Sequence, residues 1–123
     1  MNDDRVESPR FAIESHRVTT NTTVIRVAGE MCGDAAGAVL RTLAGELIGS
    51  RDVLVLDLCA VSDIDVDGLD ALHTAAGLAA EEDIGFCLVD APNGAVRARL
   101  GAQQSAEAFE IFSSVNDALR DSR

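Results

Sequence analysis

Three aspartates at alternate positions are the residues of this sequence whose type and spacing could do chemistry. Asp63, Asp65 and Asp67 follow the apolar segment VLVLDL, with four residues between that segment and Asp63, and Asp67 directly precedes Gly68. Carboxylates at this spacing, followed by glycine, match the first half of a calcium-binding loop. The second half fails, because Thr74 stands where a bidentate Glu is needed. A metal-binding loop is therefore the lesser hypothesis, and a charged binding surface is the stronger one.

Two other kinds of chemistry find less support. Asp57, near the end of the apolar segment, suggests a phospho-acceptor receiver domain, but such domains also use a Lys and this chain contains none. The missing Lys equally excludes the phosphate-binding motif GxxxxGK[ST]. His16 and His73 have no nucleophile at a spacing that would place it within hydrogen-bond reach. We therefore predict a protein that is not an enzyme, with no catalytic residue and no cofactor.

Charge and hydropathy restrict the possible partners. The chain has 21 acidic and 10 basic residues, a formal net charge of -11, and every basic residue is Arg. Nucleic acids and anionic membranes would be repelled, so a charged partner should present a basic face. No apolar run approaches the ~20 residues of a membrane span, and the polar first ten residues contain no apolar h-region. We expect a soluble cytoplasmic protein, either a monomer or a weak dimer.

The cysteines fit a reducing compartment. Cys32, Cys59 and Cys87 are odd in number and match neither a disulfide framework nor a metal-ligand spacing. A core or incidental role is the first interpretation for all three. Cys32 and Cys59 fall near expected loops, so a redox role for this pair stays open.

Hydrophobic periodicity predicts the elements that position the aspartates. Residues 1–10 form a polar lead-in, and residues 11–120 form a single α/β domain. The first two strands should form an antiparallel hairpin. Asp34 can cap the first helix, and Val96 and Leu100 should point inward from the third. The expected order is strands 11–18 and 22–28, a turn at 29–33, a helix from 34 to about 49, strand 53–58, a helix at 68–80, strand 84–89, a short helix, strand 109–112, and a helix capped by Ser113 or Ser114 that runs to 120.

The apolar strand explains why the acidic segment should be functional. Val53 to Leu58 contains a single polar residue, Asp57, which indicates a strand buried on both faces between parallel neighbours. The segment after it lies at the carboxyl edge of the sheet, where open α/β folds usually bind their ligands.

The sequence resembles a known family of domains over most of its length. The order of elements, the turn Gly29-Glu30-Met31-Cys32, the run VLVLDLCAVSDIDVDGLDAL and the later VRARLG resemble the STAS domain of bacterial anti-sigma factor antagonists. The likeness covers residues 11–120. It implies an α/β, STAS-like fold, with a mixed sheet of about five strands, an N-terminal antiparallel hairpin and about four helices.

The resemblance also implies a function. Antagonists of this family bind an anti-sigma factor, typically a serine kinase of the histidine-kinase-like ATPase fold, until phosphorylation of the residue before the motif's glycine ends the binding. Aligned on Gly68, Asp65 matches the motif's Asp, Val66 replaces its first Ser, and Asp67 replaces the phosphoacceptor. Cys32 stands where the family's turn more often has Asp.

The resemblance and the residues together give the predicted site. Asp67 either mimics the phosphorylated form in part or serves a partner interface that was never regulated by phosphorylation. A role as helix N-cap is compatible with both. Ser62, Thr74 or Ser113 could carry a displaced phosphorylation site, with nothing to favour one of them. Arg97 and Arg99 are interpreted as a solvated helix face. The predicted partner-binding residues are Asp34, Asp65, Val66, Asp67, Gly68 and Leu69.

One further family role stays open. A STAS domain can also be the accessory subunit of a transporter ATPase, where no phosphorylation is needed.

Overall fold

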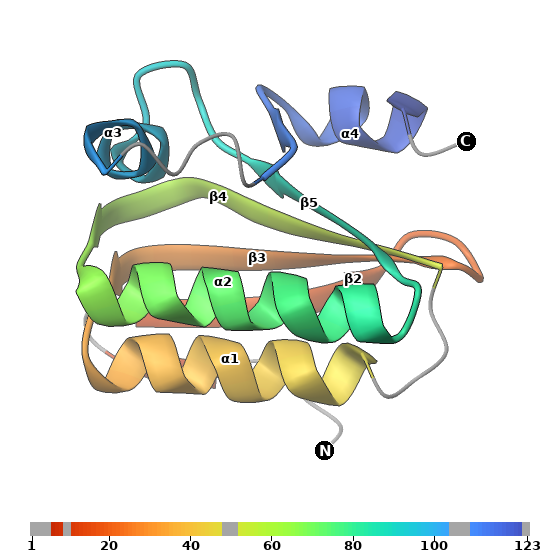
Figure 1. The fold of residues 1–123 in the computed structure, drawn as a ribbon, viewed down its shortest axis with the longest axis horizontal. Helices are drawn as coiled ribbons and strands as arrows, with labels where there is room; N and C mark the ends of the chain where they lie inside the picture. Colours follow the sequence, from red (N-terminus) through yellow and green to blue (C-terminus); the bar gives the residue numbers. More distant parts are fainter. Residues whose placement is uncertain (1–5, 9–10, 48–51, 104–108, 122–123) are drawn as a thin grey trace.

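A six-stranded sheet with helices on both faces forms the molecule (Figure 1). The computed structural model describes residues 6–8, 11–47, 52–103 and 109–121. The strands are β1 (Val6–Ser8), β2 (Phe11–Arg17), β3 (Thr22–Met31), β4 (Val53–Ile64), β5 (Gly85–Val89) and β6 (Ile111–Phe112). The helices are α1 (Asp34–Leu47), α2 (Val66–Glu81), α3 (Ala95–Ala102) and α4 (Val115–Asp121).

The sheet is antiparallel at one end and parallel at the other. Strands β1, β2 and β3 pair antiparallel, whereas β3 to β6 pair parallel in sequence order. Parallel neighbours need crossover connections, which α1, α2 and α3 supply. The predicted α/β fold with an N-terminal antiparallel hairpin is therefore confirmed.

The sheet gains a strand from the segment predicted to be a polar lead-in. Val6 pairs with Ile13 and Ser8 with Phe11, so β1 extends the sheet beyond the expected hairpin. The rest of residues 1–10 lies outside the described residues.

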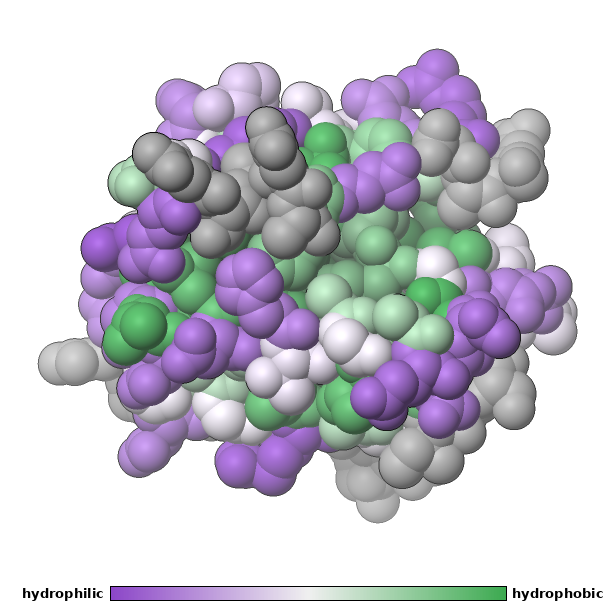
Figure 2. All heavy atoms as spheres, in the orientation of Figure 1, coloured by the Kyte–Doolittle hydropathy of each residue, from purple (hydrophilic) through white to green (hydrophobic). Residues whose placement is uncertain are grey.

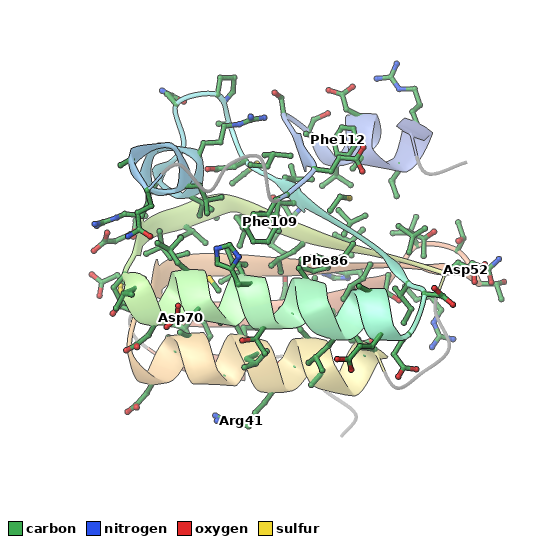
Figure 3. All side chains as sticks on the ribbon, in the orientation of Figure 1. Arg41, Asp52, Asp70, Phe86, Phe109 and Phe112 are labelled. Carbon is green, nitrogen blue, oxygen red and sulfur yellow. The ribbon has the colours of Figure 1, made fainter. Side chains whose placement is uncertain are left out.

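Two hydrophobic layers explain why β4 is apolar along most of its length. On one face, α1 and α2 cover a core in which Ile25, Leu56 and Leu72 are fully buried. On the other face, Val55 and Val89 pack against α4 in a smaller core. Figure 3 shows the aromatic side chains divided in the same way, since Phe86 and Phe109 lie on the α2 side of β5 and Phe112 lies beside α4. A strand covered on both faces has few positions left for polar residues.

The helix stripes predicted from spacing are confirmed where the structure describes them. Val39 and Leu43 of α1 are fully buried, as is Leu100 of α3, and Val96 is 1% exposed. The predicted end of the first helix near Gly49 lies outside the described residues. Within the described part of the chain, no helix is long and apolar enough to cross a membrane.

The acidic segment is a strand end and a helix start rather than a loop. Strand β4 does not stop at Leu58 but continues to Ile64, and α2 begins at Val66 rather than at Gly68. The pairing with β3 shifts register twice, since Arg26 pairs with Asp57 but Ala28 with Ala60, and a second shift follows at Gly29. These β-bulges keep the polar end of β4 in the sheet, which is why alternation alone did not predict it.

Candidate functional site

Asp65 joins two segments that are distant in sequence at the carboxyl edge of the sheet. Its backbone is extended, and its Oδ1 accepts a hydrogen bond of 3.0 Å from the N–H of Gly68 in the first turn of α2. Its Oδ2 accepts one of 3.2 Å from the N–H of Gly33, in the turn between β3 and α1. One carboxylate therefore holds the start of α2 against the start of α1. We call Gly33, Asp65, Val66, Asp67 and Gly68 the α2 corner.

Two glycines make this close approach possible. A Cβ on Gly68 would collide with the carbonyl oxygen of Met31 and with the side chain of Ile64. Gly33 has a φ of +56°, in the left-handed region that other residues adopt only at a cost. The corner therefore has a defined shape before any partner arrives.

The next two residues of the corner point outward. Val66 is 61% exposed, which is unusual for a large apolar side chain, and Asp67 is exposed beside it. Figure 2 shows an isolated hydrophobic group among hydrophilic atoms at the end of the molecule where α2 begins. Figure 3 places Asp70 on the same end of the helix. The corner thus combines an exposed apolar contact with negative charge.

The role of N-cap belongs to a different aspartate from the one predicted. Asp65 caps α2, whereas Asp67 lies within its first helical turn and does not cap it. A carboxylate in that turn still interacts favourably with the helix dipole, by roughly 0.3 to 1 kcal/mol. The prediction was wrong because it started the helix at Gly68.

The remaining predicted site residues divide by burial. Asp34 is exposed and is the first residue of α1, so it lies within the helix and is not the N-cap that the sequence predicted. Gly68 is buried and Leu69 is only 2% exposed, in the core beneath the helix. The side chain of Leu69 therefore positions the corner from below and does not itself reach the surface.

Asp63 and Cys32 extend the polar surface beside the corner. The thiol of Cys32 lies 3.9 Å from Oδ2 of Asp63, and Nη2 of Arg99 lies 3.7 Å from Oδ1. The ion pair is exposed on both sides and contributes little to stability. Burial, followed by the charges of Asp65, Asp63 and Glu30, raises the pKa of the Cys32 thiol.

The calcium-loop hypothesis does not fit this geometry. Asp63 lies in a strand, both carboxylate oxygens of Asp65 accept backbone N–H groups, and Asp67 lies in a helix. Among the described residues, no group of three His, Cys, Asp or Glu side chains is arranged to hold a metal ion.

Asp57 is equally unsuited to a receiver-domain role. It lies in the middle of β4, is 5% exposed, and accepts hydrogen bonds from Arg26 Nε at 3.3 Å and from the N–H of Cys59 at 3.1 Å. Desolvation, followed by the hydrogen bond and the negative charge of the adjacent Asp57, raises the pKa of Cys59 to about 11. Since both Cys32 and Cys59 have raised pKa values, both hold their protons at neutral pH, which disfavours a reactive thiolate at either position.

Each of the two histidines lies close to one other side chain. Nε2 of His16 lies 3.5 Å from a Glu14 oxygen, and the ring centroid of His73 lies 4.9 Å from that of Phe109.

A second helix corner, at α3, was not singled out from the sequence. Asp90 is 1% exposed, and its carboxylate accepts from the N–H groups of Ala91 at 3.0 Å and Arg97 at 2.9 Å. A Cβ on Gly94 would collide with that carboxylate. The sequence signal is an Asp just before Pro92-Asn93-Gly94, which are residues typical of a turn, and this local pattern does not indicate that the carboxylate accepts from Arg97.

The STAS domain model matches residues 15–118, so the chain belongs to the STAS domain family. A search of curated proteins finds no match.

Solved structures agree with this family. An anti-sigma factor antagonist from Mycobacterium paratuberculosis superposes with a TM-score of 0.79 at 23% identity, covering 96% of this chain and 99% of its own. The antagonist SpoIIAA in its unphosphorylated form gives 0.72 at 16% identity, with 87% and 92% covered. A sulfate transporter family protein from Wolinella succinogenes gives 0.71 at 19% identity, with 86% and 88% covered. These structures share the fold, and anti-sigma factor antagonists are among them.

Proposed function

We propose that this protein is an anti-sigma factor antagonist-like regulator, acting in the cytoplasm, that binds an anti-sigma factor of the serine kinase type. The family and the fold shared with known antagonists support the general class. The observation that carries the proposal is the exposure of Val66 and Asp67 on a helix start that Asp65 holds in place. An apolar side chain and a charge on a preorganised backbone are suited to recognition by a protein partner.

Asp67 distinguishes this protein from an antagonist that is regulated by phosphorylation. It stands where the resemblance places the phosphoacceptor, and a carboxylate offers a serine kinase no hydroxyl. It supplies one negative charge where a phosphate brings nearly two, so it mimics the modified state only in part. We therefore propose that the unmodified protein binds its partner and that phosphorylation at this position plays no part.

Charge constrains the partner's surface. Asp34, Asp63, Asp67 and Asp70 are all exposed around the corner, and the whole chain has a net charge of -11. The partner should present Lys or Arg to this edge, and association should weaken as salt screens the charges.

Calorimetry with purified anti-sigma kinases of the source organism tests the proposal. The wild-type protein and an Asp67→Ser variant are titrated side by side in the absence of a nucleoside triphosphate, so that neither can be phosphorylated. We expect both to bind. If only the Ser variant binds, Asp67 holds the protein in an off state. If neither binds any kinase, the antagonist proposal fails.

A second candidate function is the accessory subunit of a transporter ATPase. Such a subunit needs no hydroxyl at position 67, so Asp67 is compatible with this role, and the fold also occurs in a sulfate transporter family protein. Co-purification from source cells separates the two, because the accessory subunit would bring a nucleotide-binding transport subunit with it and the antagonist would bring a kinase.

A further inference from the structure

A polar connection between α3 and the turn before α4 lies on the opposite face of the sheet from α2 (Figure 1). Nε of Arg97 donates to the carbonyl oxygen of Asp90 at 3.2 Å, and the backbone N–H of Arg97 donates to the Asp90 carboxylate at 2.9 Å. Nη2 of the same guanidinium donates to Oγ of Ser113 at 3.3 Å. Arg97 is thus anchored by Asp90 and directed toward the Ser113 hydroxyl.

Ser113 is accessible in a way that suits modification. It is exposed and lies in the irregular segment between β6 and α4. Ser62 and Thr74 are exposed too, but they lie within β4 and α2. In the described part of the chain, neither of their hydroxyls has a guanidinium within hydrogen-bond distance, whereas that of Ser113 does. The structure therefore separates three residues that the sequence left equal.

We propose that Ser113 is a phosphoacceptor and that Arg97 holds the phosphate. In the reaction, Oγ of Ser113 bonds to the γ-phosphorus of a nucleoside triphosphate, the bond from that phosphorus to the bridging oxygen breaks, and the nucleoside diphosphate leaves. The hydroxyl proton passes to the base of a separate protein kinase. This inference does not depend on docking at the α2 corner.

The electrostatics favour the product. A phosphoserine carries about 1.5 to 2 negative charges and three acceptor oxygens, which a planar guanidinium can bind in a bidentate manner. Arg97 already touches the hydroxyl, so little further ordering is required. Two acids are close: Asp90 is engaged by two backbone N–H groups, and Asp117 pairs with Arg120 at 2.7 Å. They reduce the attraction, but Arg97 is the charged group that hydrogen-bonds directly to the Ser113 hydroxyl.

The pairing is tested by placing phosphoserine at position 113 of the full chain during translation and titrating it by ³¹P NMR. We expect the second pKa of the phosphate to be lower by about half a unit in the wild-type background than with Arg97→Gln, since the pair is partly exposed. Phosphoserine at position 62 is the matched control and should titrate alike in both backgrounds. Equal values at position 113 in the two backgrounds would overturn the assignment.

Two further measurements keep the result interpretable. Thermal melting of unmodified Arg97→Gln establishes that the variant folds, and Arg97→Lys should retain part of the shift because it keeps the charge. Mass spectrometry of the protein from growing and from starved cells of its source organism asks whether the modification occurs. Phosphate on Ser113 supports the proposal, and an unmodified Ser113 in both conditions overturns it.

Discussion

The starts of α2 and α3 use the same physical device for different ends. Each has an aspartate carboxylate that accepts one backbone N–H from the first turn of the helix, and each has a glycine at which a Cβ would collide with its surroundings. Asp65 is half-buried and joins α2 to the turn before α1, whereas Asp90 is almost completely buried and serves only the corner at α3.

The two helix starts differ in the exposure of their first helical residues. After Asp65 the chain presents Val66 and Asp67 to solvent, whereas Val96 in the first turn of α3 is buried. An Asp-and-Gly helix start is therefore not in itself a sign of function. Exposure of the residues after the cap separates a corner that can present a surface from one that holds the fold together.

Removing the buried carboxylate of Asp90 should have the largest effect on stability. Asp90→Ala leaves the N–H groups of Ala91 and Arg97 without their acceptor, and each unsatisfied buried group costs about 1 to 3 kcal/mol. We expect a loss of about 3 kcal/mol in the free energy of unfolding, measured by urea denaturation. Affinity for the partner, measured on the folded protein, should be unchanged. A loss below about 1 kcal/mol would show that water replaces the carboxylate easily.

The close approach at the α2 corner should come next. Gly68→Ala forces a Cβ against the Met31 carbonyl and Ile64, so we expect a loss of about 2 kcal/mol together with weaker docking. Gly77→Ala in the same helix is the matched control, because nothing lies within 4 Å of its Cβ position. That variant should be unchanged or more stable by up to about 1 kcal/mol. Equal effects of the two substitutions in urea titrations would contradict the packing argument.

Charge reversal at the exposed corner should separate docking from stability. Asp67→Lys should abolish binding in calorimetry, while the free energy of unfolding falls by less than about 1 kcal/mol through the lost dipole interaction. Glu81→Lys makes the same change of charge at the far end of α2 and should bind normally. Wild-type affinity in the Asp67→Lys variant would show that the partner binds elsewhere.

The smallest expected effect is at alkaline pH. The pKa of Cys59 is raised from 9.0 to about 11 in the folded protein, so the unfolded chain releases this proton first and stability falls as pH rises from about 9 toward 11. The side chain is exposed, which limits the loss to under about 1 kcal/mol. The chain contains no Lys and no Tyr, so few other side chains titrate in this range. Urea denaturation at about pH 8 and pH 10.5 under reducing conditions should show a smaller decrease for Cys59→Ala, because the contribution of the Cys59 thiol is then absent. An identical decrease in both proteins would exclude Cys59 as its source.

The order of elements was predictable because it rests on local periodicity. Alternating apolar residues indicated strands, and Val39, Leu43, Val96 and Leu100 at helical spacing indicated the buried stripes. The extension of β4 to Ile64 was not predictable in this way, because Ser62 and Asp63 are polar and their place in the sheet depends on bulged pairing with β3.

The sequence by itself determined the fold class, the acidic charge, and the absence of a hydroxyl at position 67, because these depend on composition and short-range pattern. Only the tertiary structure decided that Asp65 is the cap and that Leu69 belongs to the core. It also brought Arg97 to Ser113, 16 residues away in sequence, and Gly33 to Asp65, 32 residues away. Such contacts depend on which distant N–H, carboxylate and hydroxyl groups the folded backbone brings together, and no local pattern encodes that distance.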